Sequence, residues 1–397
     1  MIPVVSDLDV AGRRLVVRAD LNVPMEAGRV SDATRIARFA RGMKPLLARG
    51  AALVILSHFG RPKGQPTPAS SLRLIRDDLS RALGRPVRFA ELETAAIEAL
   101  ALAPGQVLLV ENLRFDPGEE RNDPALAATL AALGDLYVND AFSCAHRAHA
   151  STEAIAGLLP AVAGPLMAEE LTALTAALEA PHRPSVAIVG GSKVSTKIAV
   201  LKNLVGRLDH VIVGGGMANT FLFADGAPMG RSLHEADQLD TVHEIRALAA
   251  QSGCTIHLPA DVTVARDFRA HAAAETVPAD ACPPDAMILD AGPQAVADFT
   301  RVLEGARTIL WNGPLGAFEM QPFDLATMAL ARVAADLTRG RTAVTVAGGG
   351  DTVAALNAAG VTHDFTYVST AGGAFLEWLE GRTLPGIAAL MRQTEEV

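Results

Sequence analysis

Short runs of apolar residues alternate with longer amphipathic stretches along almost the whole chain, and this alternation most constrains the fold. Leu53-Val54-Ile55-Leu56 and Val107-Leu108-Leu109-Val110 contain no polar residue, and helical patterns such as Thr34–Arg49 separate runs of this kind. A strand without polar alternation is buried on both faces, as in parallel sheets covered by helices. The pattern therefore predicts an α/β fold built on parallel sheets.

The apolar runs form two series, which indicates two lobes. The first series lies at residues 15–18, 53–56, 107–110 and 136–138, and the second at 186–189, 211–213, 287–289, 308–311 and 343–346. A helical stretch, Met167–Leu178, stands between them and is followed by Pro181 and Pro184. A helix closed by prolines is typical of a domain boundary, and a length of 397 residues suits two domains.

The composition restricts the class of protein. With half of its residues apolar and a net charge of −9, the chain is expected to be globular rather than disordered. The acidic balance and an aromatic fraction of 4% argue against a nucleic-acid partner. Three widely spaced cysteines without a CxxC pair argue against a disulfide framework and a structural zinc site. Because we find neither a secretory signal nor a membrane-spanning stretch, we expect a cytoplasmic protein without a membrane partner.

In the first series, polar and charged side chains follow the strands. Ligands bind beyond the carboxyl ends of parallel strands, and arginine forks bind phosphate and carboxylate groups. The candidates at these positions are Asp20, Asn22, Arg35, His58, Arg61, Arg114 and Arg147. His58 could instead be a buried core histidine, although its place in a Ser-His-x-Gly-Arg-Pro loop favours a ligand role. This set predicts a pocket for a small phosphorylated acid.

In the second series, glycine follows the strands instead. Examples are Gly190-Gly191-Ser192-Lys193, Gly214-Gly215-Gly216 and Gly348-Gly349-Gly350-Asp351-Thr352. Glycine lets the backbone approach a ligand closely, and a helix that starts there directs free N–H groups at phosphate. None of the loops matches the GxGxxG or GxxxxGK[ST] pattern. The second lobe is therefore predicted to bind a nucleotide, but through neither of those two motifs.

Lysine is rare, with 5 lysines against 30 arginines, and three of the five lie between residues 193 and 202. Lys193 and Lys197 would share one face if the chain is helical from Val194 onward. Their position beside a glycine turn favours phosphate contact over a solvated helix face, whereas Lys202 is interpreted as solvated.

Several acidic residues keep more than one interpretation. Asp351 could cap a helix or approach a phosphate-bound Mg²⁺. Glu319 could cap a helix or accept a hydrogen bond from a ribose hydroxyl. The acidic run of Asp116, Glu119 and Glu120 is interpreted as solvated surface.

The motifs together resemble those of the phosphoglycerate kinase family. Long segments match in order along most of the chain, among them Ser57–Pro62, Glu111–Phe115, Gly190–Lys197, Trp311–Pro314 and Gly348–Thr352. The resemblance implies two Rossmann-like lobes, each a parallel sheet covered by helices on both faces, joined by a hinge helix. The implied parts are a substrate lobe at 1–166, a helix and hinge at 167–181, a nucleotide lobe at 182–371 and a segment returning to the first lobe at 372–397.

The resemblance also implies a reaction. A hinge-bending, monomeric enzyme would reversibly transfer the γ-phosphoryl group of ATP to the carboxylate of 3-phosphoglycerate, giving 1,3-bisphosphoglycerate and ADP in glycolysis and gluconeogenesis. The seven candidates of the first lobe would bind 3-phosphoglycerate, and Arg35, Lys193, Lys197 and Gly350 would act in the transfer. Lys197, Gly292, Asn312, Glu319, Gly349, Gly350, Asp351 and Thr352 would bind the nucleotide, with Mg²⁺ at Asp351. The sequence departs from the family pattern at Ser192, Thr196 and Ala371, which concerns the tuning of the reaction rather than its type.

Two other classes of protein remain open at this point. A nicotinamide-dependent dehydrogenase shares the fold class, but its GxGxxG turn is missing here. A non-catalytic protein that binds phosphorylated ligands would need only one of the two predicted pockets.

Overall fold

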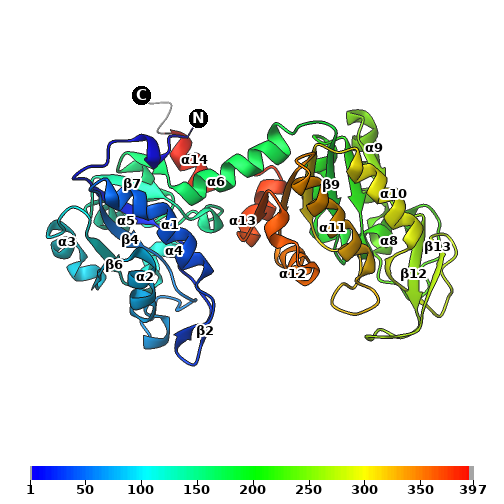
Figure 1. Cartoon of the computed structure of the whole chain (residues 1–397), viewed down its shortest axis with the longest axis horizontal. Helices are drawn as coiled ribbons and strands as arrows, with labels where there is room; N and C mark the ends of the chain where they lie inside the picture. Colours follow the sequence, from blue (N-terminus) through cyan, green and yellow to red (C-terminus); the bar gives the residue numbers. More distant parts are fainter. Residues whose placement is uncertain (1, 393–397) are drawn as a thin grey trace. The chain divides into compact units, whose positions relative to one another are not determined.

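The computed structural model describes residues 2–392, and their contacts divide the chain into two compact units (Figure 1). The first unit runs to Leu171 and resumes at Thr383, and the second spans Thr172–Arg382. Helix α14 (Pro385–Arg392) therefore packs with the N-terminal half of the chain.

A six-stranded parallel sheet forms the middle of the first unit, with the strand order β5-β6-β4-β1-β7-β8. Its strands are β1 (Arg14–Arg18), β4 (Ala52–Leu56), β5 (Val87–Ala90), β6 (Val107–Val110), β7 (Leu136–Asn139) and β8 (Ala161–Ala163). The four predicted runs are the central strands, and β5 and β8 extend the sheet at its two edges. Because the chain leaves β1 toward one edge and later returns to β7 on the other side, the strand order reverses between β1 and β7.

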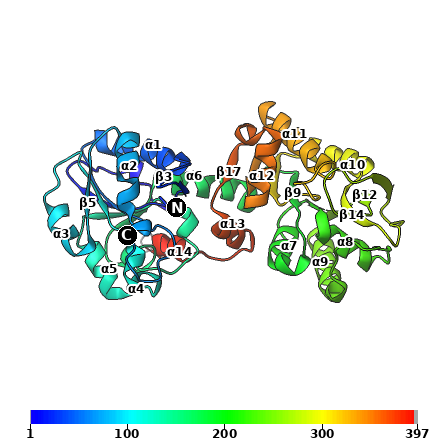
Figure 2. The same ribbon diagram turned by 90° about the horizontal axis from the view of Figure 1, so that it is seen from below.

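Helices cover this sheet on opposite sides (Figure 2). Leu15 and Val17 of β1 join a core with Phe39 and Met43 of α1 (Thr34–Ala48). Val16, between them, points to the opposite face, as the period of two of a strand requires. The other helices are α2 (Arg76–Leu83), α3 (Leu92–Leu100), α4 (Pro117–Glu120), α5 (Pro124–Ala131) and the start of α6 (Pro165–Leu174), and a small hairpin consists of β2 (Met25–Glu26) and β3 (Arg29–Val30).

Helix α6 corresponds to the helix expected at residues 167–178. It begins two residues earlier, because the carboxylate of Asp140 accepts the backbone N–H of Leu166 at 2.7 Å and so satisfies a free donor of the first turn. A π-helical turn, Thr175–Glu179, continues it to the prolines that follow.

The second unit contains a second six-stranded parallel sheet, with the order β11-β10-β9-β15-β16-β17. Its strands are β9 (Ser185–Val189), β10 (His210–Val213), β11 (Thr255–His257), β15 (Thr308–Asn312), β16 (Val344–Gly348) and β17 (Tyr367–Ser369). The order reverses between β9 and β15, so a ligand site is expected beyond the carboxyl ends of these two strands.

Two layers of helices enclose this second sheet (Figure 2). Ile188 and Trp311 pack against α10 (Pro293–Glu304), α11 (Leu325–Arg339) and α12 (Gly350–Ala359) on one face. The helices of the other layer are α7 (Ile198–Val205), α8 (Gly215–Ala224), α9 (Leu239–Ser252) and α13 (Gly372–Leu379), of which α7 contacts α9 and α13. The fold class is thus the predicted one, a parallel sheet between helical layers in each unit.

One predicted strand belongs to a different sheet from the one expected and pairs in the opposite direction. The run at residues 287–289 was predicted to belong to a parallel sheet, but β14 (Met287–Ala291) pairs antiparallel with β12 (Asp261–Ala265). Strand β13 (Ala274–Pro278) completes this small third sheet. An apolar run identifies a buried strand but not the direction of its neighbour, which explains the error.

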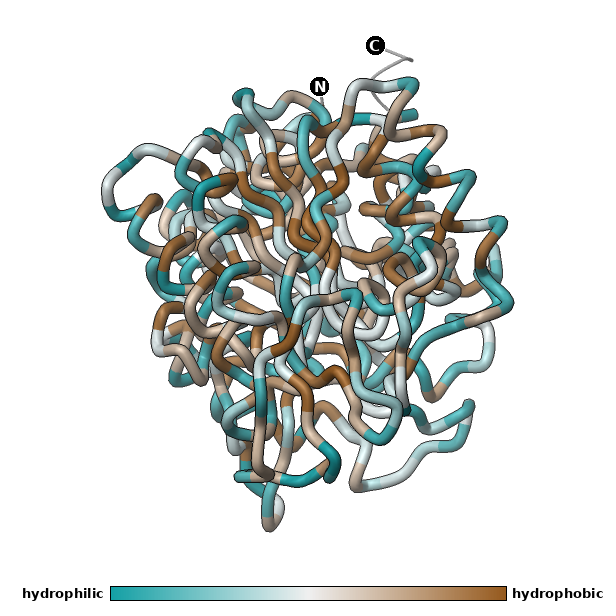
Figure 3. The backbone as a smooth tube through the Cα atoms, turned by 90° about the vertical axis from the view of Figure 1, so that its right-hand side faces the viewer, coloured by the Kyte–Doolittle hydropathy of each residue, from teal (hydrophilic) through white to brown (hydrophobic). Residues whose placement is uncertain are grey.

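The tube in Figure 3 shows hydrophilic and hydrophobic segments alternating along the chain, as expected of helices and strands with one covered face. Among residues 2–392, no helix combines the length and the apolar character that crossing a bilayer requires.

Candidate functional site

The first group of candidate residues lies beyond β1, where Asp20, Asn22 and Arg35 come together. Arg35 Nη1 donates to Asp20 Oδ2 at 2.6 Å and to the carbonyl oxygen of Asn22 at 3.1 Å. Ser143, which follows β7, donates to the same carboxylate oxygen at 2.5 Å, and Gly60 N donates to Asn22 Oδ1 at 2.9 Å. Loops after three different strands are therefore joined at one place, at the end of the sheet where its strand order reverses.

A cluster of three arginines and two histidines lies beside this group. We call Arg18, His58, Arg114, Arg147 and His149 the cationic cluster. Arg18 Nη2 lies 3.1 Å from His58 Nδ1, and Arg114 Nη1 donates to the carbonyl oxygen of Gly60 at 2.8 Å. Arg147 Nε lies 3.2 Å from the Nε2 atom of His146.

Three members of the cationic cluster, His58, His149 and Arg114, have lowered pKa values, whereas the pKa of Arg18 is raised. Burial, together with the charges of Arg18 and Arg114, lowers the pKa of His58 far below its ordinary value. Burial and the same two arginines lower the pKa of His149 to about 4, and burial together with Arg147 lowers the pKa of Arg114. Shifts of this kind arise where cations lack enough nearby negative charge, so the cluster is suited to binding an anion.

The structure corrects the interpretation of Glu119. It was predicted to be a solvated residue of an acidic run, but it is 0% exposed. Its carboxylate accepts the backbone N–H of Ser151 at 3.0 Å and the hydroxyl of the same residue at 2.6 Å. The neighbouring Asp116 caps α4 through the N–H of Gly118.

Sequence reasoning also missed Arg18 and Ser151. Arg18 ends the apolar run of β1 and is only 1% exposed, and its Nε donates to Ser151 Oγ at 2.8 Å. A charged residue at the last position of an otherwise apolar central strand was the available signal. Arg61, in contrast, was predicted as a ligand contact and is exposed.

In the second unit, Lys197 occupies the point where the strand order reverses. Its Nζ donates to the carbonyl oxygen of Gly190 at 2.7 Å, and to Asn312 Oδ1 at 2.7 Å and the carbonyl oxygen of Asn312 at 3.1 Å. Gly190 follows β9 and Asn312 ends β15. Burial lowers the pKa of Lys197 to about 8, and the charge of Asp351 opposes this shift.

Lys193 and Lys197 would share a helix face only if the chain were helical from Val194 onward, and this condition is not met. A single 3₁₀ turn covers Val194–Thr196, and α7 begins only at Ile198. Lys193 has an extended backbone and is exposed, whereas Lys197 is partly buried. Lys202 forms an ion pair with Glu244 at 2.6 Å, and its side chain is about one-third exposed.

In the glycine loop before α12, only glycine fits at position 349. Gly349 has a φ of 100°, and a Cβ there would lie 2.7 Å from Asn312 Nδ2. Helix α12 begins at Gly350, so Asp351 lies in the first turn and is not the helix cap, which excludes one of its two interpretations. Thr352 is buried, and its hydroxyl accepts the N–H of Gly313 at 2.7 Å.

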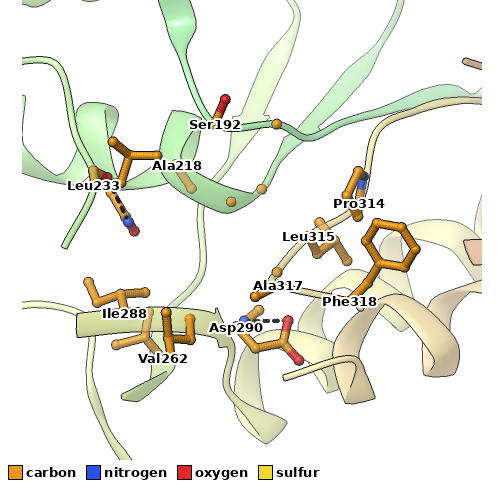
Figure 4. A pocket seen from close by; sticks show the side chains of 18 of the residues that line it. Ser192, Ala218, Leu233, Val262, Ile288, Asp290, Pro314, Leu315, Ala317 and Phe318 are labelled. Carbon is orange, nitrogen blue, oxygen red and sulfur yellow. Dashed lines mark hydrogen bonds between the residues drawn. The ribbon is translucent and has the colours of Figure 1, made fainter. Parts of the chain in front are cut away.

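A cavity of about 330 Å³ opens between the glycine loops and the small antiparallel sheet (Figure 4). Leu233 and Ile288 lie on one side of it and Leu315 and Phe318 on the other, as the view shows. Two of the predicted nucleotide residues, Glu319 and Asp351, line it as well, and both are exposed. An apolar cavity with a few polar groups at its edge is typical of a site for a small molecule.

Gly292 is not part of this cavity. Its N–H donates to the carbonyl oxygen of Asp261 at 2.9 Å, and the Asp261 carboxylate caps α10 through the N–H groups of Gln294 and Ala295. The N-terminus of α10 therefore already holds an anionic group of the protein itself.

Another lining residue, Asp290, was absent from the predicted set. Its carboxylate accepts the N–H groups of Ala291 and Ala326 at 2.9 Å each, and burial raises its pKa to about 8. The deep position of this carboxylate indicates a structural role at the start of α11.

Comparison with known proteins decides the family. A family model described as phosphoglycerate kinase matches residues 5–382. The chain belongs to the phosphoglycerate kinase family. It is therefore a phosphotransferase, as the kinases of this family are.

Named relatives agree over nearly the full length. A phosphoglycerate kinase of Dinoroseobacter shibae is 59% identical over 386 residues, which cover 97% of this chain and 98% of the relative. One from Zymomonas mobilis is 58% identical and covers 96% of this chain and 97% of the relative. The solved phosphoglycerate kinase of Coxiella burnetii has a TM-score of 0.94 at 42% identity, and that of Pyrococcus horikoshii has 0.79 at 28%, each covering 100% of both chains.

Proposed function

We propose that the chain reversibly transfers the γ-phosphoryl group of ATP to the carboxylate of 3-phosphoglycerate, giving 1,3-bisphosphoglycerate and ADP. The observation that carries this proposal is the chemical difference between the two units. One unit holds the cationic cluster, and the other holds an apolar cavity beside glycine loops and a buried lysine. A small acid with one phosphate and one carboxylate group suits the first site, and a nucleotide suits the second.

The substrate site consists of Asp20, Asn22, Arg35, His58, Arg61, Arg114 and Arg147. The cations hold the phosphate and carboxylate groups of 3-phosphoglycerate, because guanidinium forks match both anions. The side chain of Asp20 is about 15% exposed and already accepts from Arg35. It can accept a further hydrogen bond from the substrate hydroxyl and so helps to orient the acid.

The nucleotide site consists of Lys197, Gly292, Asn312, Glu319, Gly349, Gly350, Asp351 and Thr352. The apolar walls around Leu315 and Phe318 suit a base, and Glu319 at the edge can accept from a ribose hydroxyl. Asn312 acts by holding Lys197 through its side-chain oxygen at 2.7 Å. Gly292 is the weakest member of the set, because its N–H is already bonded to Asp261.

The residues present fit Mg²⁺ bound together with the nucleotide. Asp351 is an exposed carboxylate in the first turn of α12, it lines the cavity, and its charge acts on Lys197. Across residues 2–392 no group of three or more metal-ligating side chains exists, so the protein offers one carboxylate and the phosphates must offer the rest. When bound, the ion would neutralise charge on the transferred phosphate.

Transfer to a carboxylate needs no general base, because the acceptor is already ionised at neutral pH. The protein has to position the two reactants and neutralise charge as the phosphoryl group moves. Lys193 donates to the phosphate oxygens, and Lys197 does so by exchanging one of its three oxygen acceptors for a phosphate oxygen. Arg35 holds the acceptor, and the N–H of Gly350 adds a helix N-terminus. With its pKa lowered to about 8, Lys197 is still mostly charged at pH 7.

We further infer a monomeric enzyme of glycolysis and gluconeogenesis in the cytoplasm. Each candidate site is formed by residues of one unit, so neither needs a second copy of the chain for completion. The reaction does require the two sites to approach each other, and water must be kept from the acyl phosphate. The three cysteines are free and buried, which suits a reducing compartment.

A coupled assay of ADP formation from ATP and 3-phosphoglycerate tests the proposal. We expect turnover that requires both substrates and Mg²⁺. Binding of either ligand without turnover would favour a non-catalytic binding protein, and reduction of a nicotinamide cofactor would favour a dehydrogenase.

A further inference from the structure

A buried arginine and a buried carboxylate lie behind the substrate site and are not used by the mechanism described above. Arg18 is 1% exposed and Glu119 is 0% exposed. Charges are costly to bury unless their hydrogen-bonding groups are satisfied by well-placed partners. The partners of these two groups therefore indicate what the pair is for.

Ser151 joins the two charges. Its hydroxyl donates to Glu119 Oε1 at 2.6 Å and accepts from Arg18 Nε at 2.8 Å. Glu119 Oε2 accepts the backbone N–H of Ser151 at 3.0 Å, so the carboxylate binds both the backbone and the hydroxyl of this serine. The plane of the Arg18 guanidinium is thereby fixed from behind the site, and Glu119 Oε1 also lies 3.8 Å from Nδ1 of His149 in the cationic cluster.

The other end of Arg18 contacts His58. Arg18 Nη1 donates to the carbonyl oxygen of Ala19, and Nη2 lies 3.1 Å from His58 Nδ1. A guanidinium has only donors, so His58 Nδ1 must be the acceptor. The single proton of a neutral imidazole is then carried by Nε2.

We propose that Glu119 is a positioning residue that, through Ser151 and Arg18, fixes His58 as a neutral imidazole with its proton on Nε2. His58 then serves the otherwise cationic substrate site as a hydrogen-bond donor of one defined orientation. This inference rests on the proposed function, because it assumes that His58 contacts the acid substrate. It adds that the contact is made by a neutral donor, and that its strength depends on a carboxylate buried behind the site.

The burial and charges around His58 agree with this assignment. Arg114, Arg147 and His149 all act on the ring besides Arg18, and their charge disfavours a protonated His58. Cys144, whose Sγ lies 3.9 Å from Nδ1, adds a weak thiol contact. A neutral His58 can donate a hydrogen bond to an anion and does not add another buried positive charge to the cluster.

Nitrogen NMR of the full-length protein labelled with ¹⁵N-histidine tests the inference directly, with a His58→Gln variant assigning the signals. In the unchanged protein at pH 7 we expect an acceptor-type Nδ1 signal and a protonated Nε2 signal for His58. Protonation of both nitrogens, or a mixture of the two tautomers, would overturn the inference.

Ser151→Ala and Glu119→Gln interrupt the chain without altering Arg18 or His58. We expect both variants to shift the Nδ1 signal and to raise KM for 3-phosphoglycerate about tenfold with kcat unchanged. KM alone changes when the lost contact is equally strong in the bound substrate and in the transition state. Ser80→Ala is the matched control, since it removes a serine hydroxyl bonded to Val87 N in the same unit without contacting any residue of the cationic cluster. It should leave both readouts unchanged.

The outcomes separate the inference from the proposed function. If Ser151→Ala lowers the melting temperature while the His58 signals and KM stay unchanged, the chain has only a structural role and the inference is wrong. If the unchanged protein shows no turnover of 3-phosphoglycerate, the proposed function fails instead, and the NMR signals still report the state of His58. Should Glu119→Gln not fold, Ser151→Ala alone carries the test.

Discussion

Replacing Lys197 with methionine is expected to remove most of the turnover without unfolding the protein. The ammonium is held by three oxygen acceptors of Gly190 and Asn312 beside the glycine loops, where a transferred phosphate would meet it. Removal of one such preorganised charge-stabilising donor lowers kcat by about 10²–10³ in other enzymes. We expect a loss of this size for Lys197→Met in the coupled assay.

The same substitution has a stability effect whose size follows from the pKa of Lys197. Burial lowers that pKa from 10.5 to about 8, which means that the charged form is disfavoured in the folded protein by about 3 kcal/mol. Methionine removes this cost together with three hydrogen bonds to a charged group, each worth about 1.5–3 kcal/mol. At pH 7 the lost hydrogen bonds outweigh the relieved desolvation cost, so the variant should be less stable than the unchanged protein by about 2 kcal/mol or more.

The balance changes with pH, and the direction is fixed by the linkage between proton binding and stability. Between pH 8 and pH 10.5 the folded protein has released the Lys197 proton while the unfolded chain still holds it. Raising the pH through this interval therefore stabilises the folded state of the unchanged protein. Relative to Lys197→Met, the unchanged protein should gain about 2–3 kcal/mol of unfolding free energy from pH 7 to pH 10.

Urea unfolding at both pH values measures this gain, and Lys202→Met is the matched control. Lys202 lies on the same segment, but its ammonium pairs with Glu244 at the surface. Its removal should leave both kcat and the pH-dependent difference unchanged. If Lys197→Met keeps near-normal turnover, the catalytic role is refuted, and if its stability follows the unchanged protein at both pH values, the account of its burial is refuted.

Three further predictions follow from the geometry of the two sites. Arg35→Ala should lower kcat sharply in the coupled assay while circular dichroism stays unchanged, because the arginine holds the acceptor but does not belong to the core; near-normal turnover would contradict this. Gly349→Ala should lower the free energy of unfolding by about 1–3 kcal/mol, since φ is 100° and the new Cβ would lie 2.7 Å from Asn312 Nδ2, whereas Gly350→Ala, with nothing within 4 Å, should have a much smaller effect. Asp351→Asn should raise the Mg²⁺ concentration needed for half-maximal rate, and an unchanged Mg²⁺ titration would argue against a metal role.

The sequence predicted most of the architecture because buried parallel strands leave a strong local signal. Apolar runs such as Leu53–Leu56 became central strands, and the residues after them, including Asp20 and Arg35, were found side by side. Strand β13 left no such signal, because all but one of its five residues are exposed. The antiparallel partner of β14 is β12, whose residues were not among the predicted strands, so the direction of pairing could not be read from the run at 287–289.

The errors at the site have a common physical reason, which is that contacts across the fold override the local pattern. Glu119 stands next to the exposed Glu120 in the sequence, yet a loop some thirty residues later supplies Ser151 and buries it. Lys193 and Lys197 have helical spacing, but α7 starts after them. A local motif indicates which residue types are available and cannot show which of them a distant loop will cover.

The presence of arginine at position 18 and of lysine at position 197 has an electrostatic reason. Arg18 stays charged although it is almost completely buried, because the pKa of a guanidinium is high enough to survive desolvation and is in fact raised by neighbouring groups such as Glu119. A lysine buried to a smaller extent at position 197 already has its pKa lowered to about 8. A lysine in place of Arg18 would therefore lose its proton and with it the hold on His58, whereas Lys197 needs a compact ammonium that three carbonyl-type oxygens can surround. The two positions therefore call for different cations. Arginine suits position 18, where a charge must persist without solvent, and lysine suits position 197, where a small cation must fit between two strand ends.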